Sequence, residues 1–285
     1  MSWFTVSWAI LLSGVLGATA SGAIGMNYRK NGVFNAGLAG IFYFGKYPSH
    51  ILVSILQMNP YWSIPFSLVF GAMFNLAFNV GILQMLKRGY SRRKISLITS
   101  FFVLIGYLAG KGLRWLFRNL YGGQIPHLHF LDHDFILFRT PGILIISVSL
   151  MIFSLALQFI LNPVIEDRKD NKFDGWEIFI YTLAGATACV AGSLHSFAFS
   201  ATRSDILLIV AGALLGGVDK KLNPYIGGFV VSFLKIWLTI KSMEIIGQWA
   251  GEYSIMILVA LILFSVLLYP IGIVGRFRKK VEYKY

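Results

Sequence analysis

The stretch Asn31-Gly-Val-Phe-Asn-Ala-Gly-Leu-Ala-Gly-Ile-Phe-Tyr-Phe-Gly45 decides how this chain folds. It places four glycines around the amide of Asn35, inside an apolar segment that follows the charged step Arg29-Lys30. Glycine lets two backbones approach closely, and it lets a helix break where polar backbone faces a pathway instead of lipid. This pattern is typical of membrane transporters, so Asn35 and Gly37 are candidates for residues that line a substrate pathway. The alternative for Asn35 is a structural hydrogen bond between helices.

The composition indicates an all-α, polytopic bundle of transmembrane helices. Of the 285 residues, 56% are hydrophobic and only 13% are charged, whereas a soluble domain is about 25% charged. Several runs without charged side chains exceed the roughly 20 residues needed to cross the hydrocarbon layer. The net charge of +13 does not indicate nucleic-acid binding, because the basic residues gather in short loops and in the tail, as membrane topology requires.

The apolar runs predict one transmembrane domain over residues 1–285. Residues 1–25 lack the basic start of a signal peptide, so we expect an uncleaved first span. The run at 204–218 is too short to cross unaided, which predicts a re-entrant helix or a half helix packed among others. Glycine-rich interruptions at 32–45 and 212–228 predict broken helices and an internal repeat. The expected spans are 3–25, 31–57 (broken), 61–86, 95–111, 140–162, 176–200, 204–218, 222–246 and 252–274.

Loop charges predict the orientation in the cell membrane. Loop 87–94 and the tail after Gly275 are basic, and loop 163–175 carries mixed charges. Cytoplasmic loops are enriched in Lys and Arg, so we place all three in the cytoplasm and segment 112–139 outside.

Three motifs, in chain order, carry a resemblance to a known family. The first is Gly32-Val-Phe-Asn-Ala-Gly-Leu-Ala-Gly40, followed by Gly45-Lys-Tyr47. The second is Ile206-Leu-Leu-Ile-Val-Ala-Gly-Ala-Leu-Leu-Gly-Gly217, and the third is Tyr269-Pro-Ile-Gly-Ile-Val-Gly-Arg276. Together they resemble the permease subunits of ABC importers for branched-chain amino acids, and equally the nucleoside and simple-sugar branch of that superfamily.

The resemblance implies alternating access in a pathway shared with a second permease subunit, in a homodimer or heterodimer. It also implies cytoplasmic ATP-binding subunits and an extracytoplasmic substrate-binding protein. The chain departs from the family pattern at Leu38 and Ala39, where a His and a Glu are usual, and it lacks the usual coupling helix. The docking loop is then 163–175, whose candidate residues are Glu166, Asp167, Arg168, Lys169 and Asp170.

Other polar residues in the spans are further candidates for the pathway. Asn75 and Asn79 share a helix face at i, i+4, and Ser193 lies near the end of the span 176–200; the alternative is again helix–helix hydrogen bonding. Lys235 and Lys241 interrupt an apolar run, which is compatible either with a functional site inside the membrane or with snorkelling to the interface, and we expect snorkelling.

The sequence holds no motif for catalysis or nucleotide binding. It has no Gly-x-x-x-x-Gly-Lys-Ser/Thr loop and no nucleophile–base pattern, so we expect a non-enzymatic chain without cofactor. His127, His129 and His133 stand beside two carboxylates, but their spacing fits no structural metal site, so they are only weak metal candidates. The alternative functions are a non-transporting membrane anchor subunit and an ion-coupled secondary carrier, which usually buries carboxylates.

Overall fold

The computed structural model describes residues 3–54, 56, 58–121, 136–137, 140–166, 175–198 and 204–247. Within these residues the chain forms nine α-helices, and six of them are long and apolar enough to cross a membrane. The predicted all-α, polytopic bundle is therefore confirmed. The elements are α1 (Trp3–Asn31), α2 (Gly37–Ser54), the 3-10 turn η1 (Pro60–Trp62), α3 (Ser63–Lys87), α4 (Arg92–Tyr121), the two-residue strands β1 (Ile136–Leu137) and β2 (Thr140–Pro141), α5 (Gly142–Ile160), α6 (Asn162–Glu166), α7 (Gly175–Ala198), α8 (Ser204–Gly216) and α9 (Asn223–Ile246).

The first helix is longer than the span 3–25 expected from the sequence. α1 continues to Asn31, and the charged step Arg29-Lys30 forms its last turn instead of a loop. Both side chains are buried, because polar groups of α5, α6 and α7 receive them. The chain then breaks at residues 32–36, where Gly32 has a φ of 71°, and α2 begins at Gly37. α4 likewise exceeds the expected 95–111 at both ends, and the span expected at 252–274 lies outside the described residues.

The eighth helix is short. α8 has 13 residues, which at the standard rise gives a length of about 20 Å, less than the roughly 30 Å of a hydrocarbon layer. It packs mainly against α9 and α1. Its sequence is almost entirely apolar, as expected for a half-helix enclosed by neighbouring helices.

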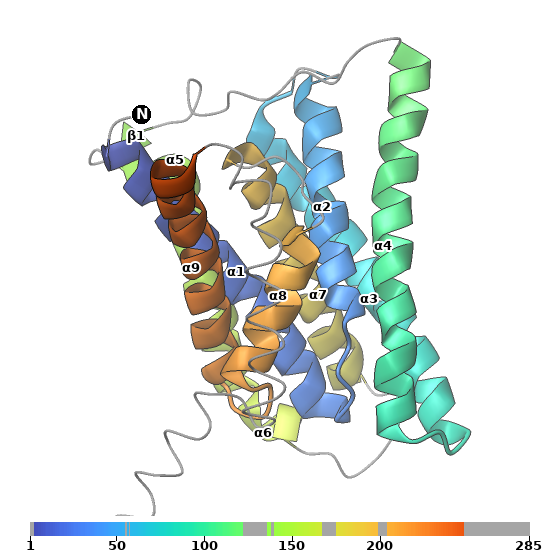
Figure 1. The fold of residues 1–285 in the computed structure, drawn as a ribbon. Helices are drawn as coiled ribbons and strands as arrows, with labels where there is room; N and C mark the ends of the chain where they lie inside the picture. The colour runs from blue at the N-terminus through green and yellow to red at the C-terminus, as the bar shows by residue number, and fades with distance from the viewer. Residues whose placement is uncertain are drawn as a thin grey trace, which may run out of the picture.

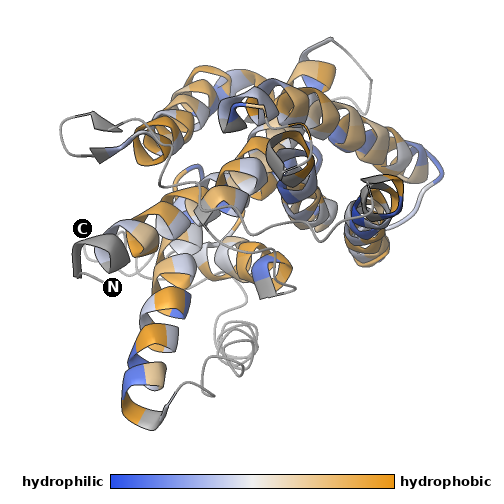
Figure 2. Ribbon diagram, turned by 90° about the horizontal axis from the view of Figure 1, so that it is seen from above, coloured by the Kyte–Doolittle hydropathy of each residue, from blue (hydrophilic) through white to orange (hydrophobic). Residues whose placement is uncertain are grey.

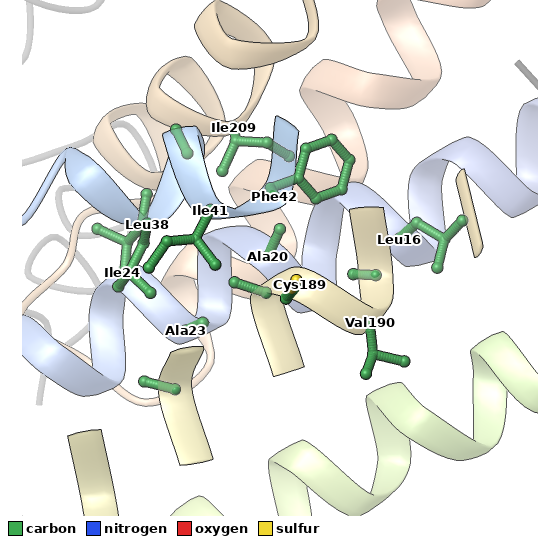
Figure 3. Close-up of a cluster of buried hydrophobic side chains, with 14 of the residues drawn as sticks. Leu16, Ala20, Ala23, Ile24, Leu38, Ile41, Phe42, Cys189, Val190 and Ile209 are labelled. Carbon is green, nitrogen blue, oxygen red and sulfur yellow. The ribbon is translucent and has the colours of Figure 1, made fainter. Parts of the chain in front are cut away.

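The core of the bundle lies where α1, α2, α7 and α8 meet. Figure 3 shows Ala20 of α1, Phe42 of α2, Cys189 of α7 and Ile209 of α8 in one apolar cluster. Large exposed apolar side chains lie instead on α3, α4, α5 and α9, and Figure 2 shows hydrophobic colour along these outer helices. Apolar side chains on the outside and polar side chains on the inside are what a lipid environment requires.

Small residues let α3 pack closely against α7. A Cβ atom on Gly71 of α3 would collide with the carbonyl oxygen of Gly185 and with Cβ of Cys189, both on α7. Close contact of this kind drives helix association where the surrounding lipid removes the hydrophobic advantage.

The same arrangement joins α9 to α1. A Cβ atom on Gly228 of α9 would collide with the carbonyl oxygen of Gly17 and with Cβ of Ser21, both on α1. Gly17 precedes Gly185 by the same number of positions as Ser21 precedes Cys189. In Figure 1, α1 runs opposite to α7, α2 runs opposite to α8, and α3 runs opposite to α9. These matched contacts support the expected internal repeat, and its two copies are inverted.

Three connections gather at one end of the bundle. Figure 1 places the turn between α3 and α4, the helix α6, and the turn between α8 and α9 at the same end. The start of α1 lies at the opposite end. Loops 87–94 and 163–175, which the sequence assigns to one side of the membrane, therefore begin on the same side.

Candidate functional site

The break between α1 and α2 is held by buried amide groups. Asn35 is fully buried in the break, and its Oδ1 accepts a hydrogen bond of 3.0 Å from the backbone nitrogen of Gly37, the first residue of α2. Its Nδ2 donates to Oδ1 of Asn75 on α3 over 3.2 Å. Asn35 thus satisfies one of the free N–H groups at the start of α2 and also bonds the break to α3.

Asn75 is the centre of this arrangement. Its Oδ1 accepts hydrogen bonds from the Nδ2 atoms of Asn27, Asn35 and Asn79 over 3.4, 3.2 and 3.1 Å. Its own Nδ2 donates to the carbonyl oxygen of Tyr181 on α7 over 2.7 Å. One side chain therefore joins α1, the break, α3 and α7.

Asn31, the last residue of α1, completes the group. Its Nδ2 donates to Oδ1 of Asn27 over 3.0 Å and to Oδ1 of Asn79 over 3.1 Å. Its Oδ1 accepts from the backbone nitrogen of Val33 over 2.8 Å. We call Asn27, Asn31, Asn35, Asn75 and Asn79 the amide cluster, and every member is buried.

The sequence analysis found three members of the amide cluster and missed Asn27 and Asn31. A signal for them was present, because Asn27, Asn31 and Asn35 recur every four residues, like Asn75 and Asn79. The charged step at Arg29-Lys30 made that part of the sequence look like a loop.

Ser193 does not join the amide cluster but belongs to a second polar group. Its Oγ lies 2.5 Å from Oγ of Ser49 on α2 and 2.9 Å from Oγ of Ser63 at the start of α3. Twelve positions of α7 separate it from Tyr181, which is about 18 Å along a helix. Hydrogen-bonding side chains therefore occupy two levels of the bundle interior.

A buried ionic cluster, which the sequence analysis missed, joins three helices. Asp205 in the first turn of α8 accepts hydrogen bonds from Nζ of Lys46 on α2 over 2.6 Å and from Nζ of Lys235 on α9 over 3.2 Å. Lys46 and Asp205 are 0% and 2% exposed. The snorkelling expected for Lys235 is wrong, because its ammonium group points to Asp205. Asp205 lies at the start of the short helix α8, and its carboxylate is buried there.

Aromatic and imidazole rings border the ionic cluster. The ring of His195 on α7 meets the ring of Phe42 edge to face, with centroids 5.5 Å apart. Nζ of Lys46 lies 5.4 Å from the centroid of the same Phe42 ring, within the range of a cation–π contact. Charged and polar groups inside a membrane bundle are costly and mark pathways for solutes or ions.

Two sets of predicted residues fall largely outside the described part of the chain. Glu166 ends α6, and the rest of the predicted docking residues, Asp167 to Asp170, are not described. The same holds for His127, His129 and His133. Within the described ranges, no group of three His, Cys, Asp or Glu side chains could hold a metal ion.

Comparison with known proteins gives a relative that matches over nearly the whole chain. The chain is 25% identical to the probable branched-chain amino acid transport permease protein LivH of Methanocaldococcus jannaschii, over 96% of this chain and 93% of that protein. No protein-family model matches the chain. The resemblance to permeases drawn from the three glycine motifs is thereby confirmed.

A solved structure shares the fold. PsaBC from Streptococcus pneumoniae, determined in complex with a Fab, superposes with a TM-score of 0.51 over 98% of this chain and 95% of that chain. The sequence identity between the two is 14%. At that identity the similarity concerns the arrangement of the helices alone.

Proposed function

We propose that this chain is the membrane-spanning permease subunit of an ABC importer that carries branched-chain amino acids by alternating access. The observation that carries the proposal is the similarity to a branched-chain amino acid permease over 96% of this chain. The break between α1 and α2, held by the amide cluster, supports it, because transporters with inverted repeats build their solute sites at discontinuous helices.

The ionic cluster and its neighbours suit a zwitterionic solute with an apolar side chain. Lys46 and Lys235 place two ammonium groups against the single carboxylate of Asp205, so the cluster has an excess of positive charge that suits a solute carboxylate, and the Phe42 ring lies against Lys46. A nucleoside or a neutral sugar needs hydrogen-bonding groups but no such charges. We therefore favour an amino acid over the nucleoside and sugar alternatives.

Asp205 gives little support to an ion-coupled carrier. A carboxylate that binds a transported proton or cation must be able to exchange its counter-charge. Here two lysines already compensate the Asp205 carboxylate in the bundle interior. The energy source in our proposal is instead a pair of cytoplasmic ATP-binding subunits, docked at the end that holds α6, with a second permease subunit and an outer substrate-binding protein.

The test begins with the intact complex. The chain is tagged, isolated from its own cell membrane in mild detergent, and its associated subunits are identified by mass spectrometry. The complex is then reconstituted in proteoliposomes, and uptake of radiolabelled leucine is measured with and without ATP. We expect ATP-dependent uptake that isoleucine and valine inhibit, and that adenosine and ribose do not.

The other outcomes separate the alternatives. Absence of an ATP-binding subunit, with no uptake of any solute, would support a membrane anchor. Leucine uptake driven by an ion gradient without ATP would support a secondary carrier. If adenosine or ribose inhibited uptake while isoleucine and valine did not, the chain would be assigned to the nucleoside and sugar branch.

A further inference from the structure

The last turn of α1 carries two buried cations that neither the amide cluster nor the ionic cluster uses. Arg29 and Lys30 are 2% and 8% exposed. Basic side chains in the last turn of a helix interact favourably with its C-terminal dipole. That effect alone would leave them in solvent, so their burial requires specific partners.

Arg29 is bonded to the end of α5 and the start of α6. Its Nη1 donates to Oδ1 of Asn162 over 3.3 Å, and its Nη2 donates to Oε1 of Gln158. Gln158 is itself fixed, because its Nε2 donates to the hydroxyl of Tyr225 on α9 over 2.7 Å and to the carbonyl oxygen of Gly22 on α1 over 3.1 Å. Arg29 therefore contacts a rigid set of groups.

Lys30 contacts both α6 and the first turn of α7. Its Nζ donates to the carbonyl oxygen of Val164 in α6 over 3.1 Å. The same atom lies 3.7 Å from Oε1 of Glu177 in the first turn of α7. One ammonium group thus joins these two helices.

The opposite face of the same turn belongs to the amide cluster. Successive residues of an α-helix are rotated by about 100°, so Arg29 projects roughly opposite to Asn27 and Asn31. Those two amides bond to α3 and to the break before α2. A single helical turn is therefore bonded to α5, α6 and α7 through Arg29 and Lys30, and to α3 and the break through Asn27 and Asn31.

We propose that Arg29 and Lys30 are positioning residues that transmit movement of α6 and of the start of α7 to the broken α1–α2 helix. This inference rests on the proposed function, because it gives ATP-driven movement of these two elements a route to the solute pathway. Hydrogen bonds to a charged group are stronger than those between neutral groups, and coupling between distant sites is carried by contiguous packed and hydrogen-bonded elements. A shift of α6 and of the start of α7 would therefore displace the end of α1 and the amides that close the break.

The experiment measures coupling and not only transport. Arg29→Gln and Lys30→Gln are each reconstituted as the full complex, beside Arg29→Lys, Lys30→Arg and Lys220→Gln. Lys220 is an exposed cation in the turn between α8 and α9, at the same end of the bundle, so its variant controls for loss of charge. The readouts are co-elution of the ATP-binding subunits, ATP hydrolysis, and radiolabelled leucine transported per ATP hydrolysed.

We expect the two glutamine variants to assemble and to hydrolyse ATP, with leucine transported per ATP reduced at least tenfold. The two conservative variants and the control should retain more than half of the unmodified ratio. An unchanged ratio in both glutamine variants would overturn the inference. Loss of assembly in both, with the control intact, would also overturn it, since the cations would then serve only folding. If the unmodified chain has no ATP-binding partner, the proposed function itself has failed.

Discussion

Lys46 and Asp205 form an ion pair that joins α2 to α8 in the bundle interior, with Nζ 2.6 Å from Oδ2. The second oxygen of Asp205 pairs with Lys235 of α9 over 3.2 Å. One carboxylate therefore connects the first half of the inverted repeat with two helices of the second half. Removing one partner of a buried ion pair is more damaging than the pair is stabilising, because the other charge remains in a poorly solvating interior.

Asp205→Asn is expected to destabilise the protein strongly. It removes the carboxylate that both lysines share and leaves Lys46 buried, a change that typically costs about 3–5 kcal/mol. Lys46→Met should cost less, because Asp205 keeps Lys235. Thermal unfolding of the purified variants in detergent shows which of the two substitutions lowers the unfolding temperature more.

The matched control for Asp205→Asn is Lys241→Met. Lys241 pairs with Glu244 over 2.7 Å, but both side chains are more than one-third exposed, and exposed pairs contribute roughly 0–1 kcal/mol. If Lys46→Met lowered the unfolding temperature more than Asp205→Asn, the shared role of the carboxylate would be refuted.

Asn75→Leu is expected to disturb the amide cluster more than any other single substitution in it. The change keeps the side-chain volume but removes the acceptor of three amides and the donor to Tyr181. Each buried polar group left without a partner costs about 1–3 kcal/mol. We expect a lower unfolding temperature and a loss of leucine uptake in the reconstituted complex.

Gln84→Leu is the corresponding control, since Gln84 is an exposed amide on the same helix. It should leave both the unfolding temperature and uptake close to those of the unmodified protein. Equal behaviour of the two variants would show that the amide cluster does not hold the broken helix in place.

Gly71→Ala is expected to separate α3 from α7. The new methyl group would meet the carbonyl oxygen of Gly185 and Cβ of Cys189, neither of which can move freely. Overpacking of this kind costs typically 1–3 kcal/mol. Gly228→Ala should behave similarly, because it makes the matching contact of α9 with α1.

Gly81→Ala offers a control on the same helix as Gly71. The nearest atom to its added Cβ is Cζ of Phe102 at 4.0 Å, an ordinary van der Waals distance. Alanine also favours a helix over glycine by about 1 kcal/mol. The unfolding temperature should therefore stay the same or rise in this variant, and a fall equal to that of Gly71→Ala would contradict the packing argument.

Much of the fold is predictable from the sequence because a membrane-spanning helix requires a long run of apolar residues. The glycines around Asn35 predicted the break after Asn31. The short apolar run between Asp205 and Asp219 predicted that α8 is short. The sequence suggested a repeat from two glycine-rich interruptions, but these follow α1 and α8, which are not equivalent helices of the repeat. Its matched contacts, such as Gly71 with Gly185, appear only when the helices are assembled.

The candidate site was less predictable because its partners lie far apart in the sequence. Lys46 and Asp205 are separated by 159 positions, so no local spacing connects them. Arg29 and Lys30 had the pattern of a loop, since a charge next to an apolar run usually leaves the membrane. Only the positions of Gln158, Val164 and Glu177 explain why they stay inside.

The basic end of the bundle is expected to face the cytoplasm. Tyr90 in the turn between α3 and α4, and Lys220 in the turn between α8 and α9, are exposed at this end, whereas the exposed Leu56 precedes η1 at the other. The first of these turns is flanked by five basic residues, and short cytoplasmic loops carry such residues. In intact cells, a membrane-impermeant maleimide should therefore label Leu56→Cys but neither Tyr90→Cys nor Lys220→Cys.

Permeabilised cells complete the experiment, because Tyr90→Cys and Lys220→Cys should then react as well. The native Cys189 is buried, so the unmodified protein serves as the unlabelled control. If Tyr90→Cys and Lys220→Cys were labelled from opposite sides, the inverted repeat would be contradicted. The turn between α8 and α9 would then lie at the opposite end of the bundle from the turn between α3 and α4. Labelling of both in intact cells would instead keep the repeat and reverse the orientation, and α6 could no longer dock a cytoplasmic ATP-binding subunit.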